Sequence, residues 1–360
     1  SFRKGIQTQI RQRGGIAAAL FRTAIKLGTR VNGDWFRKRF DPVSLAAWPV
    51  YLVLRSFVAR KVRLSLGGRL VFMVSGGSAC SIDHVRWFTA LGIPVYQGYG
   101  LSETSPIISA NTNKKGYFKI GSSGRPFPWA DLRIEGESGE ALPRGETGEI
   151  CVKGPCVMLG YWRNEAATRE AIVDGWFHTG DLGYLDKDGF LFIVGRIKSL
   201  LVGENGEKYS PESLEQHIVD NVPLVSQVML YNQQKPFTVA LVVPDVQRVR
   251  DVVEAENGAG VTDAVLDSVI EDVRRALLRY RKDPALSSVF VDTWTPKTFA
   301  LLPEAFSEEN GTMNSSLKMV RRRIVERYQE RIRRLYDVEE EPLNPSNREA
   351  LRSWRSRETP

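Results

Sequence analysis

The stretch YQGYGLSETSP (Tyr96–Pro106) joins two tyrosines, two glycines, hydroxyl side chains and a single carboxylate directly after an apolar run. Upstream, RLVFMV (Arg69–Val74) predicts a buried strand, IDHVRWFTALG an amphipathic helix, and IPVYQGYG a second strand. Strand, helix and strand joined by short turns predict a parallel sheet covered by helices. Ligands bind outside the carboxyl ends of strands in such sheets, which is where SGGS and GYGLSET fall.

The residue types in this turn suit a phosphorylated ligand. Glycine at 98 and 100 lets the backbone pass close to a flat ligand, and Tyr99 offers a ring to stack on it. The hydroxyls of Ser102 and Thr104 can bond a phosphate, while Glu103 can hold a hard divalent cation. A plain strand-to-helix turn capped by Ser102 explains the same residues equally well.

The residue pattern changes near residue 121 and stays changed to residue 195. Short alternating runs such as GEICVKG and GFLFIVG are separated by Gly, Pro and Asp turns, which predicts an antiparallel β-module, a distorted barrel. Asp181 lies between two glycines, where its carboxylate can accept hydrogen bonds from ribose hydroxyls; an ordinary turn aspartate is the alternative. His178 shows no obvious partner carboxylate or cysteine, so we expect a packing or hydrogen-bonding role rather than a catalytic one. DKDG lacks the remaining calcium ligands and predicts a hairpin turn.

Two further segments carry charge at places where elements change. GRIKSLLVGENGEKYSPESLE marks 196–199 as a domain boundary, and Arg196 there can reach a ribose or phosphate as a forked donor. In MNSSLKMVRRRI, Lys318 opens a basic helix expected over 316–336, and a lysine there can neutralise a phosphate in a transition state. One more lysine on a basic helix is the simpler interpretation.

Composition limits the function classes. The 360 residues carry a net charge of +8, with fifteen Lys/Arg in residues 1–70 against two Asp. That segment, expected to be mostly helical, lacks the aromatic interleaving of nucleic-acid binders, so we expect no nucleic acid. Its basic and apolar mix favours contact with an anionic membrane surface. The apolar run Ser44–Val58 is shorter than a bilayer span, and no secretory signal is visible, which predicts a cytoplasmic protein peripheral to the inner membrane face.

The cysteines predict neither a disulfide framework nor a metal centre. Cys80, Cys151 and Cys156 are too few and odd in number, and no second Cys/His cluster accompanies the last two. We therefore expect reduced, buried thiols.

Taken in order, the motifs resemble the adenylate-forming superfamily, in particular its long-chain fatty acid–CoA ligases. The matching residues, from about 61 to 328, read VSGGSACS, GIPVYQGYGLSETSP, IGSSGRPFP, GETGEICVKGPCVMLGYWRNEAAT, DGWFHTGDLGYLDKDGFLFIVGRIKSLLV, GENGEKYSPESLE and LLPEAFSEENGTMNSSLK. The resemblance implies an α/β fold: the remainder of a large adenylate-forming domain, with a parallel sheet, helices and the barrel module, followed by a small α+β C-terminal domain. The implied divisions are 1–120, 121–198, a mobile domain over 199–336, and a charged, loosely ordered tail over 337–360.

The same resemblance assigns roles to residues. It implies adenine binding by Tyr99 and Gly100, ribose binding by Asp181 with Arg196, and Mg²⁺ of ATP on Glu103. Ser102, in place of the usual threonine, and Thr104 would line the phosphates. The other implied residues are the adenine border Gly76, Gly77 and Ser78, the catalytic Lys318, the hinge Ser199 in place of a common aspartate, and the CoA-proximal turn Gly203, Glu204, Asn205 and Gly206.

The implied reaction has two halves. A fatty acid carboxylate attacks the α-phosphate of ATP to give acyl-adenylate and pyrophosphate, and the thiol of coenzyme A then takes the acyl group and releases AMP. The family swings its small domain between these halves. NSSLK replaces the usual threonine–proline–threonine approach to the lysine. The family's upstream Ser/Thr/Gly-rich phosphate loop has no equivalent here, so we expect an incomplete fragment that is inactive alone. A non-catalytic AMP- or acyl-binding relative and a domain that loads a carrier protein are the alternatives.

Overall fold

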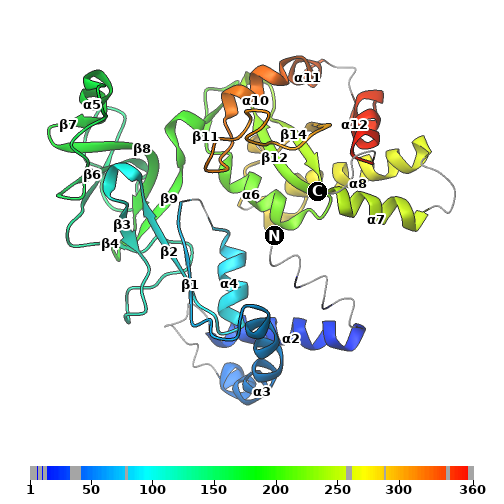
Figure 1. Ribbon diagram of the computed structural model, residues 1–360, viewed down its shortest axis with the longest axis horizontal. Helices are drawn as coiled ribbons and strands as arrows, with labels where there is room; N and C mark the ends of the chain where they lie inside the picture. Colours follow the sequence, from blue (N-terminus) through cyan, green and yellow to red (C-terminus); the bar gives the residue numbers. More distant parts are fainter. Residues whose placement is uncertain are drawn as a thin grey trace. The chain divides into compact units, whose positions relative to one another are not determined.

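The computed structural model describes residues 6, 10, 14–32, 42–77, 80–256, 262–287, 289–337 and 341–355. The chain divides into two compact units, Ser1–Ile197 and Lys198–Pro360 (Figure 1). The division falls one residue before position 199, where the sequence places the start of the mobile domain. The finer division of the first unit at residue 121 stays a prediction.

The first unit begins with a packed group of three helices, α2 (Gly15–Asn32), α3 (Pro42–Ser65) and α4 (Ile82–Ala90). Tyr51 of α3 is almost fully buried, and its hydroxyl donates to the carbonyl of Ala90 at 2.9 Å. Gly28 has no room for a side chain, because a Cβ there would lie 2.2 Å from the same carbonyl. These contacts explain why α2 and α3 pack close to the end of α4. The described part of residues 1–66 is helical, as the sequence pattern predicts.

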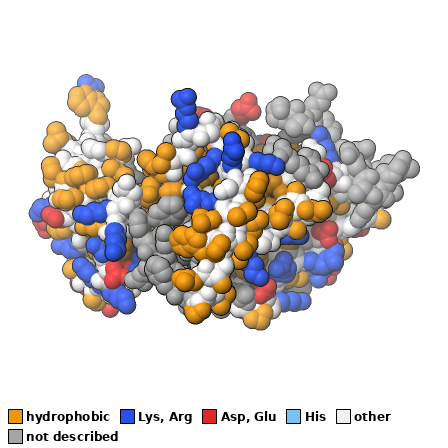
Figure 2. Space-filling view, turned by 90° about the horizontal axis from the view of Figure 1, so that it is seen from below, with side chains coloured by type: hydrophobic (Ala, Val, Ile, Leu, Met, Phe, Trp, Pro, Cys, Tyr) orange, Lys and Arg blue, Asp and Glu red, His pale blue; other side chains and the backbone are white. Residues whose placement is uncertain are grey.

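Helix α3 extends beyond the apolar run Ser44–Val58. The helix has 24 residues, ends at Ser65 and is about 36 Å long, which is enough to cross a bilayer by length and composition. The expectation that this segment is too short is therefore wrong, because the helix does not end at Val58. Few of its side chains are buried, and exposed apolar residues include Val43, Leu45, Val50, Leu52, Val53 and Phe57. Seen from below, where α2 and α3 lie in front, hydrophobic and basic side chains gather together (Figure 2).

A four-stranded sheet follows in the order β1 (Met73–Ser75), β2 (Val95–Gly100), β3 (Ile107–Ala110) and β4 (Arg125–Pro126). β1 and β2 are parallel, as the strand–helix–strand pattern predicts, and the other pairs are antiparallel. The expectation of a buried strand over Arg69–Val74 is wrong. Only three residues form β1, at the edge of the sheet, and of these Met73 packs against the core of the helices. The exposed fractions of Val71, before the strand, and of Val74 are 71% and 69%.

The antiparallel module is confirmed. β5 (Asp131–Glu135), β6 (Gly148–Lys153), β8 (Trp176–Leu185) and β7 (Ile172–Val173) form one sheet, in which β9 (Leu191–Arg196) also pairs with β8. Its buried face consists of alternate residues such as Ile150, Val152 and Leu191. Helix α5 (Glu165–Ala171) precedes β7, and the short turns η1 (Ser102–Thr104) and η2 (Ile197–Ser199) lie outside the sheet.

The second unit is built on the sheet β12 (Val225–Tyr231), β14 (Val239–Pro244) and β15 (Thr298–Leu301), with a smaller sheet β11 (Lys208–Tyr209), β10 (Leu201–Gly203) and β13 (Gln233–Lys235). Its helices are α6 (Glu212–Asn221), α7 (Val246–Glu256), α8 (Asp263–Lys282), α9 (Pro284–Ser287), η3 (Asp292–Trp294), α10 (Arg321–Arg327), α11 (Gln329–Arg334) and α12 (Pro345–Arg355). The basic helix expected over 316–336 is thus wrong at its start and is divided at Tyr328.

The expectation of a loosely ordered C-terminal tail is also wrong. Residues 345–355 form α12, which buries Ala350 and Leu351. The indole nitrogen of Trp354 donates to the carbonyl of Leu302 at 2.7 Å, and Asn347 Oδ1 accepts from the amide of Leu301 at 2.8 Å. Strongly charged composition suggested disorder, but the apolar residues fall on one helical face and pack against β15.

A buried ion pair joins three elements of the second unit. Arg321 of α10 pairs with Glu215 of α6, and Glu215 Oε1 also accepts from the amide of Leu230 in β12 at 2.6 Å. We predict that Arg321→Met destabilises this unit by about 3–5 kcal/mol, because it leaves a buried carboxylate without its cation.

The matched control is Arg322→Met, since Arg322 pairs only with Glu326 on the exposed side of α10. Urea unfolding measures both variants. A shift for Arg321→Met no larger than for Arg322→Met would contradict this assignment.

Candidate functional site

Three polar residues from distant parts of the first unit meet at Asp181. The hydroxyl of Tyr99, on β2, donates to Asp181 Oδ2 at 2.7 Å, and Arg196 Nε, on β9, lies 2.7 Å from Asp181 Oδ1. The register of β8 and β9 places Asp181 opposite Arg196. The structure therefore brings together three of the residues to which the resemblance assigns nucleotide contacts.

The carboxylate of Asp181 is held firmly. Only 3% of the residue is exposed, and its own amide donates to Thr179 Oγ1 at 3.1 Å. Burial, followed by the negative charge of Asp181, raises the pKa of Tyr99, so its hydroxyl remains a donor.

The glycines near this group have local structural reasons. A Cβ on Gly100 would lie 1.7 Å from the carbonyl of Pro106, so the turn itself requires glycine there. Gly77 has φ of 80°, a conformation that favours glycine, whereas Gly76 has ordinary space around it. Ser78 lies outside the described residues.

The three residues of the η1 turn differ in burial and in their hydrogen bonds. Thr104 is fully buried, and its hydroxyl donates to the carbonyls of Leu101 and Pro106 at 3.0 and 3.1 Å, so it closes the turn. Ser102 is exposed. Glu103 is half-buried, and its Oε1 accepts from the hydroxyl of Tyr161 at 3.1 Å. Its other carboxylate oxygen is available to a cation, so Glu103 fits a hard divalent ion.

The remaining predicted residues belong to the second unit or to its border. Lys318 is exposed on a turn that Asn314 closes: the Asn314 Oδ1 accepts from the amide of Lys318 at 2.9 Å. The turn Gly203–Gly206 links β10 to β11, with the Gly206 amide donating to the Gly203 carbonyl at 2.9 Å. Ser199 ends η2, two residues past the division between the units.

His178 has the hydrogen-bonding role that was one of the two roles expected of it, with partners that its neighbours in the sequence do not show. Its Nδ1 lies 3.0 Å from Glu149 Oε2 and 3.5 Å from Cys151 Sγ, so it has both partners that the sequence lacked. The partners are 27 or more residues away, and only the register of β6 and β8 brings them beside His178. Periodicity within β6 predicted the strand but not its alignment.

Tyr161 and Glu149 are the polar residues that sequence reasoning missed. Tyr161 stands within the quoted GYWRNEAAT motif, and Glu149 within GEICVKG, yet neither received a role. Glu149 Oε1 accepts from the amide of Gly180 at 2.8 Å, next to Asp181. Only the fold could show that these side chains hold Glu103 and the chain before Asp181.

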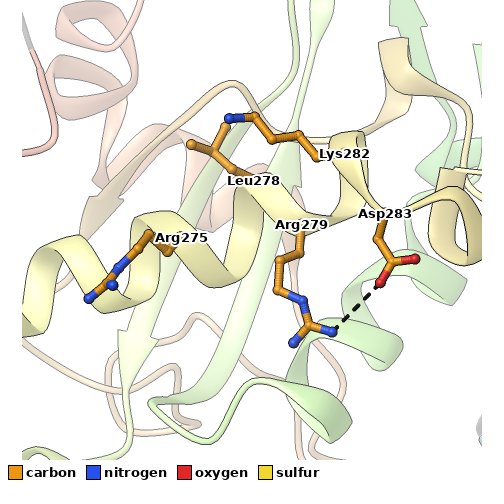
Figure 3. A pocket seen from close by; sticks show the side chains of 5 residues that line it. All are labelled: Arg275, Leu278, Arg279, Lys282 and Asp283. Carbon is orange, nitrogen blue, oxygen red and sulfur yellow. Dashed lines mark ion pairs between the residues drawn. The ribbon is translucent and has the colours of Figure 1, made fainter.

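A shallow basic hollow lies apart from these residues, on α8 of the second unit. It is lined by Arg275, Leu278, Arg279, Lys282 and Asp283 (Figure 3). Arg279 turns toward Asp283, with 3.7 Å between the charged atoms. No residue with a sequence-predicted role lines it.

The comparisons with known proteins agree on one family. Its AMP-binding enzyme model matches residues 37–162, and the AMP-binding enzyme C-terminal domain matches 198–340. A long-chain-fatty-acid–CoA ligase of Mycobacterium bovis is 34% identical over 293 residues, which cover 80% of this chain and 46% of that protein. The chain thus spans about half the length of this curated relative.

Solved structures show the same fold. The adenylation domain of a carboxylate reductase from Mycobacterium chelonae matches with a TM-score of 0.62 and 18% identity, over 88% of this chain and 45% of that one. The o-succinylbenzoate coenzyme A synthetase of Bacillus subtilis, solved with ATP and magnesium, matches with a TM-score of 0.52 and 24% identity, over 73% and 49%. This chain therefore belongs to the AMP-binding enzyme family, the adenylate-forming proteins.

Proposed function

We propose that this protein takes part in activating a long-chain fatty acid with ATP and transferring the acyl group to coenzyme A. The observation that carries the proposal is the group formed by Tyr99, Asp181 and Arg196, which presents a buried, charge-balanced carboxylate beside an aromatic residue. The fatty-acid–CoA ligase relative of Mycobacterium bovis supports the acyl class, since the alignment runs through both units.

In the first half-reaction, the fatty acid carboxylate attacks the α-phosphate of ATP and pyrophosphate leaves. Asp181 accepts hydrogen bonds from the ribose hydroxyls, Arg196 supplies positive charge beside it, and Tyr99, Gly76 and Gly77 border the adenine. Such fixed groups act by orientation and by stabilising developing negative charge.

Glu103 is the proposed magnesium ligand, with Tyr161 holding its Oε1 in place. When bound, Mg²⁺ neutralises negative charge on the phosphates. Ser102 is exposed at the start of the same turn and is the hydroxyl proposed to face the phosphate region. The buried hydroxyl of Thr104 positions that turn.

The second unit supplies different groups to the two half-reactions. Lys318 bridges the substrate carboxylate and the α-phosphate during adenylation, and its exposure on a closed turn suits a side chain that must reach a substrate. In the second half-reaction, the CoA thiol attacks the acyl carbonyl and AMP leaves. Rotation at Ser199 would then present Gly203, Glu204, Asn205 and Gly206.

A second candidate is a non-catalytic module that binds AMP or an acyl chain. It predicts AMP binding without fatty-acid-dependent release of pyrophosphate. A domain that loads a carrier protein would instead charge pantetheine on that carrier and form no CoA thioester.

The basic and apolar face of α3 supports a further proposal, peripheral contact with an anionic membrane, in keeping with a cytoplasmic protein at the inner membrane face. Phe57 is 70% exposed on this helix, near Arg60 and Lys61. Apolar insertion and attraction of lysine and arginine to anionic lipid act together in such segments.

The first prediction concerns nucleotide binding. Asp181→Asn should raise the AMP dissociation constant by about one to two orders of magnitude, because charged hydrogen-bond acceptors contribute about 1.5–3 kcal/mol. The control is Asp188→Asn, in the hairpin turn beside Lys119, which should bind AMP as the wild type does. Calorimetric titration measures both, and equal affinities for the two variants would refute the role of Asp181.

The second prediction separates the half-reactions in the protein as its own cell makes it. Lys318→Ala should abolish adenylation but leave thioester formation from supplied acyl-adenylate nearly unchanged. Lys282→Ala, an exposed lysine on α8, is the control. Pyrophosphate release and acyl-CoA formation are measured separately. Equal losses in both half-reactions for Lys318→Ala would count against the proposed bridge.

The third prediction tests the membrane surface. The protein should sediment with anionic vesicles at low salt and lose this binding at high salt, and Phe57→Ser should weaken it. Leu159→Ser removes a leucine outside the helices that is even more exposed than Phe57, and this variant should bind as the wild type does. Absence of sedimentation at low salt would rule out this contact.

A further inference from the structure

A mixed cluster of potential metal ligands lies inside the antiparallel module. Glu135 ends β5, Cys151 lies within β6, and His178 lies within β8, so the three come from adjacent strands. One ligand atom from each lies within 4.8 Å of the others. Glu135 and Cys151 are buried, whereas 25% of the His178 side chain is exposed. The cluster is therefore closed on one side and accessible on the other.

A fourth donor approaches the same imidazole. Glu149 Oε2 lies 3.0 Å from His178 Nδ1, while Glu149 Oε1 is fixed by the amide of Gly180 at 2.8 Å. The guanidinium of Arg133 forms an ion pair with Glu135 Oε1. Glu135, Cys151 and His178 thus converge, with Glu149 beside the imidazole.

We propose that Cys151, His178, Glu135 and Glu149 form a binding site for a divalent cation of the zinc class. Zinc prefers sulfur, imidazole and carboxylate ligands in a tetrahedron, which places ligand atoms about 3.5 Å apart. Cys151 Sγ and His178 Nδ1 lie 3.5 Å apart before any adjustment. A thiol in the set excludes magnesium and calcium, which require oxygen ligands. The site is separate from Glu103.

The charges at the cluster support a cation. With a neutral thiol and imidazole, the two carboxylates exceed the single guanidinium of Arg133 by one negative charge, which is costly at a mostly buried position. Binding of a dication converts the Cys151 thiol to a thiolate and releases its proton to solvent, which leaves the group neutral.

The metal-free and metal-bound states of the cluster can be told apart. Burial, then the carboxylates of Glu135 and Glu149, raise the pKa of Cys151, so the metal-free cluster holds a thiol. The two states differ in one measurable respect. Only metal binding produces a bond from sulfur to a metal.

The test is titration of the reduced, metal-stripped protein with Co²⁺ and with Zn²⁺. We expect one equivalent of Co²⁺ to produce the near-ultraviolet charge-transfer band of a cobalt thiolate, and one equivalent of Zn²⁺ to abolish the band by displacement. Zn²⁺ should also raise the unfolding temperature of the metal-free protein.

Matched variants identify the ligands. Cys151→Ser should remove the band, and His178→Gln should raise the Co²⁺ dissociation constant by more than about tenfold. Cys156→Ser is the control, since Cys156 is also buried but lies outside this cluster, where its sulfur donates to the carbonyl of Trp129 at 3.7 Å. It should keep the wild-type band and stoichiometry.

Two results would overturn the proposal. One is a wild-type spectrum without the band, which decides the matter even if Cys151→Ser fails to fold. The other is a band that persists in Cys151→Ser or disappears in Cys156→Ser, which would place the thiolate elsewhere.

Discussion

The first unit depends on the buried carboxylate of Asp181. Its two oxygens bind Tyr99 of β2 and Arg196 of β9, so one side chain connects an inner strand of the mixed sheet to two strands of the antiparallel module. A buried charge is tolerated only when it is paired and hydrogen-bonded, and here both partners also border the proposed nucleotide site. The requirement that stabilises the fold therefore also places the groups proposed to bind the ribose.

The sequence predicted the local parts of this arrangement better than their alignment. The strand and turn around Tyr99 and the antiparallel runs follow from residue type and periodicity. The contacts of His178 with Cys151 and Glu149 depend on strand register, which periodicity leaves open. The helix over residues 345–355 was not predicted, because the charged composition suggested disorder and the apolar face that packs against β15 is narrow.

Apolar side chains at β1, just before it and on α3 are exposed, whereas those on the inner face of the antiparallel module are buried. Val71, Val74 and Phe57 are each more than two-thirds exposed, although parallel sheets are ordinarily buried on both faces. This chain spans about half the length of its M. bovis relative, and the second unit carries a complete sheet with its helices. In the proposed function, the first unit binds the ribose and magnesium. The second unit supplies Lys318 for the first half-reaction and the turn Gly203–Gly206 for the second.

The most direct measurement is exchange of labelled pyrophosphate into ATP by the protein as its own cell makes it, with its intact mass determined on the same sample. The account predicts exchange that requires both magnesium and a long-chain fatty acid. No exchange from a sample that still binds AMP would contradict it and leave a nucleotide-binding module. The mass would then show whether that module has the 40.5 kDa of these residues or belongs to a longer chain.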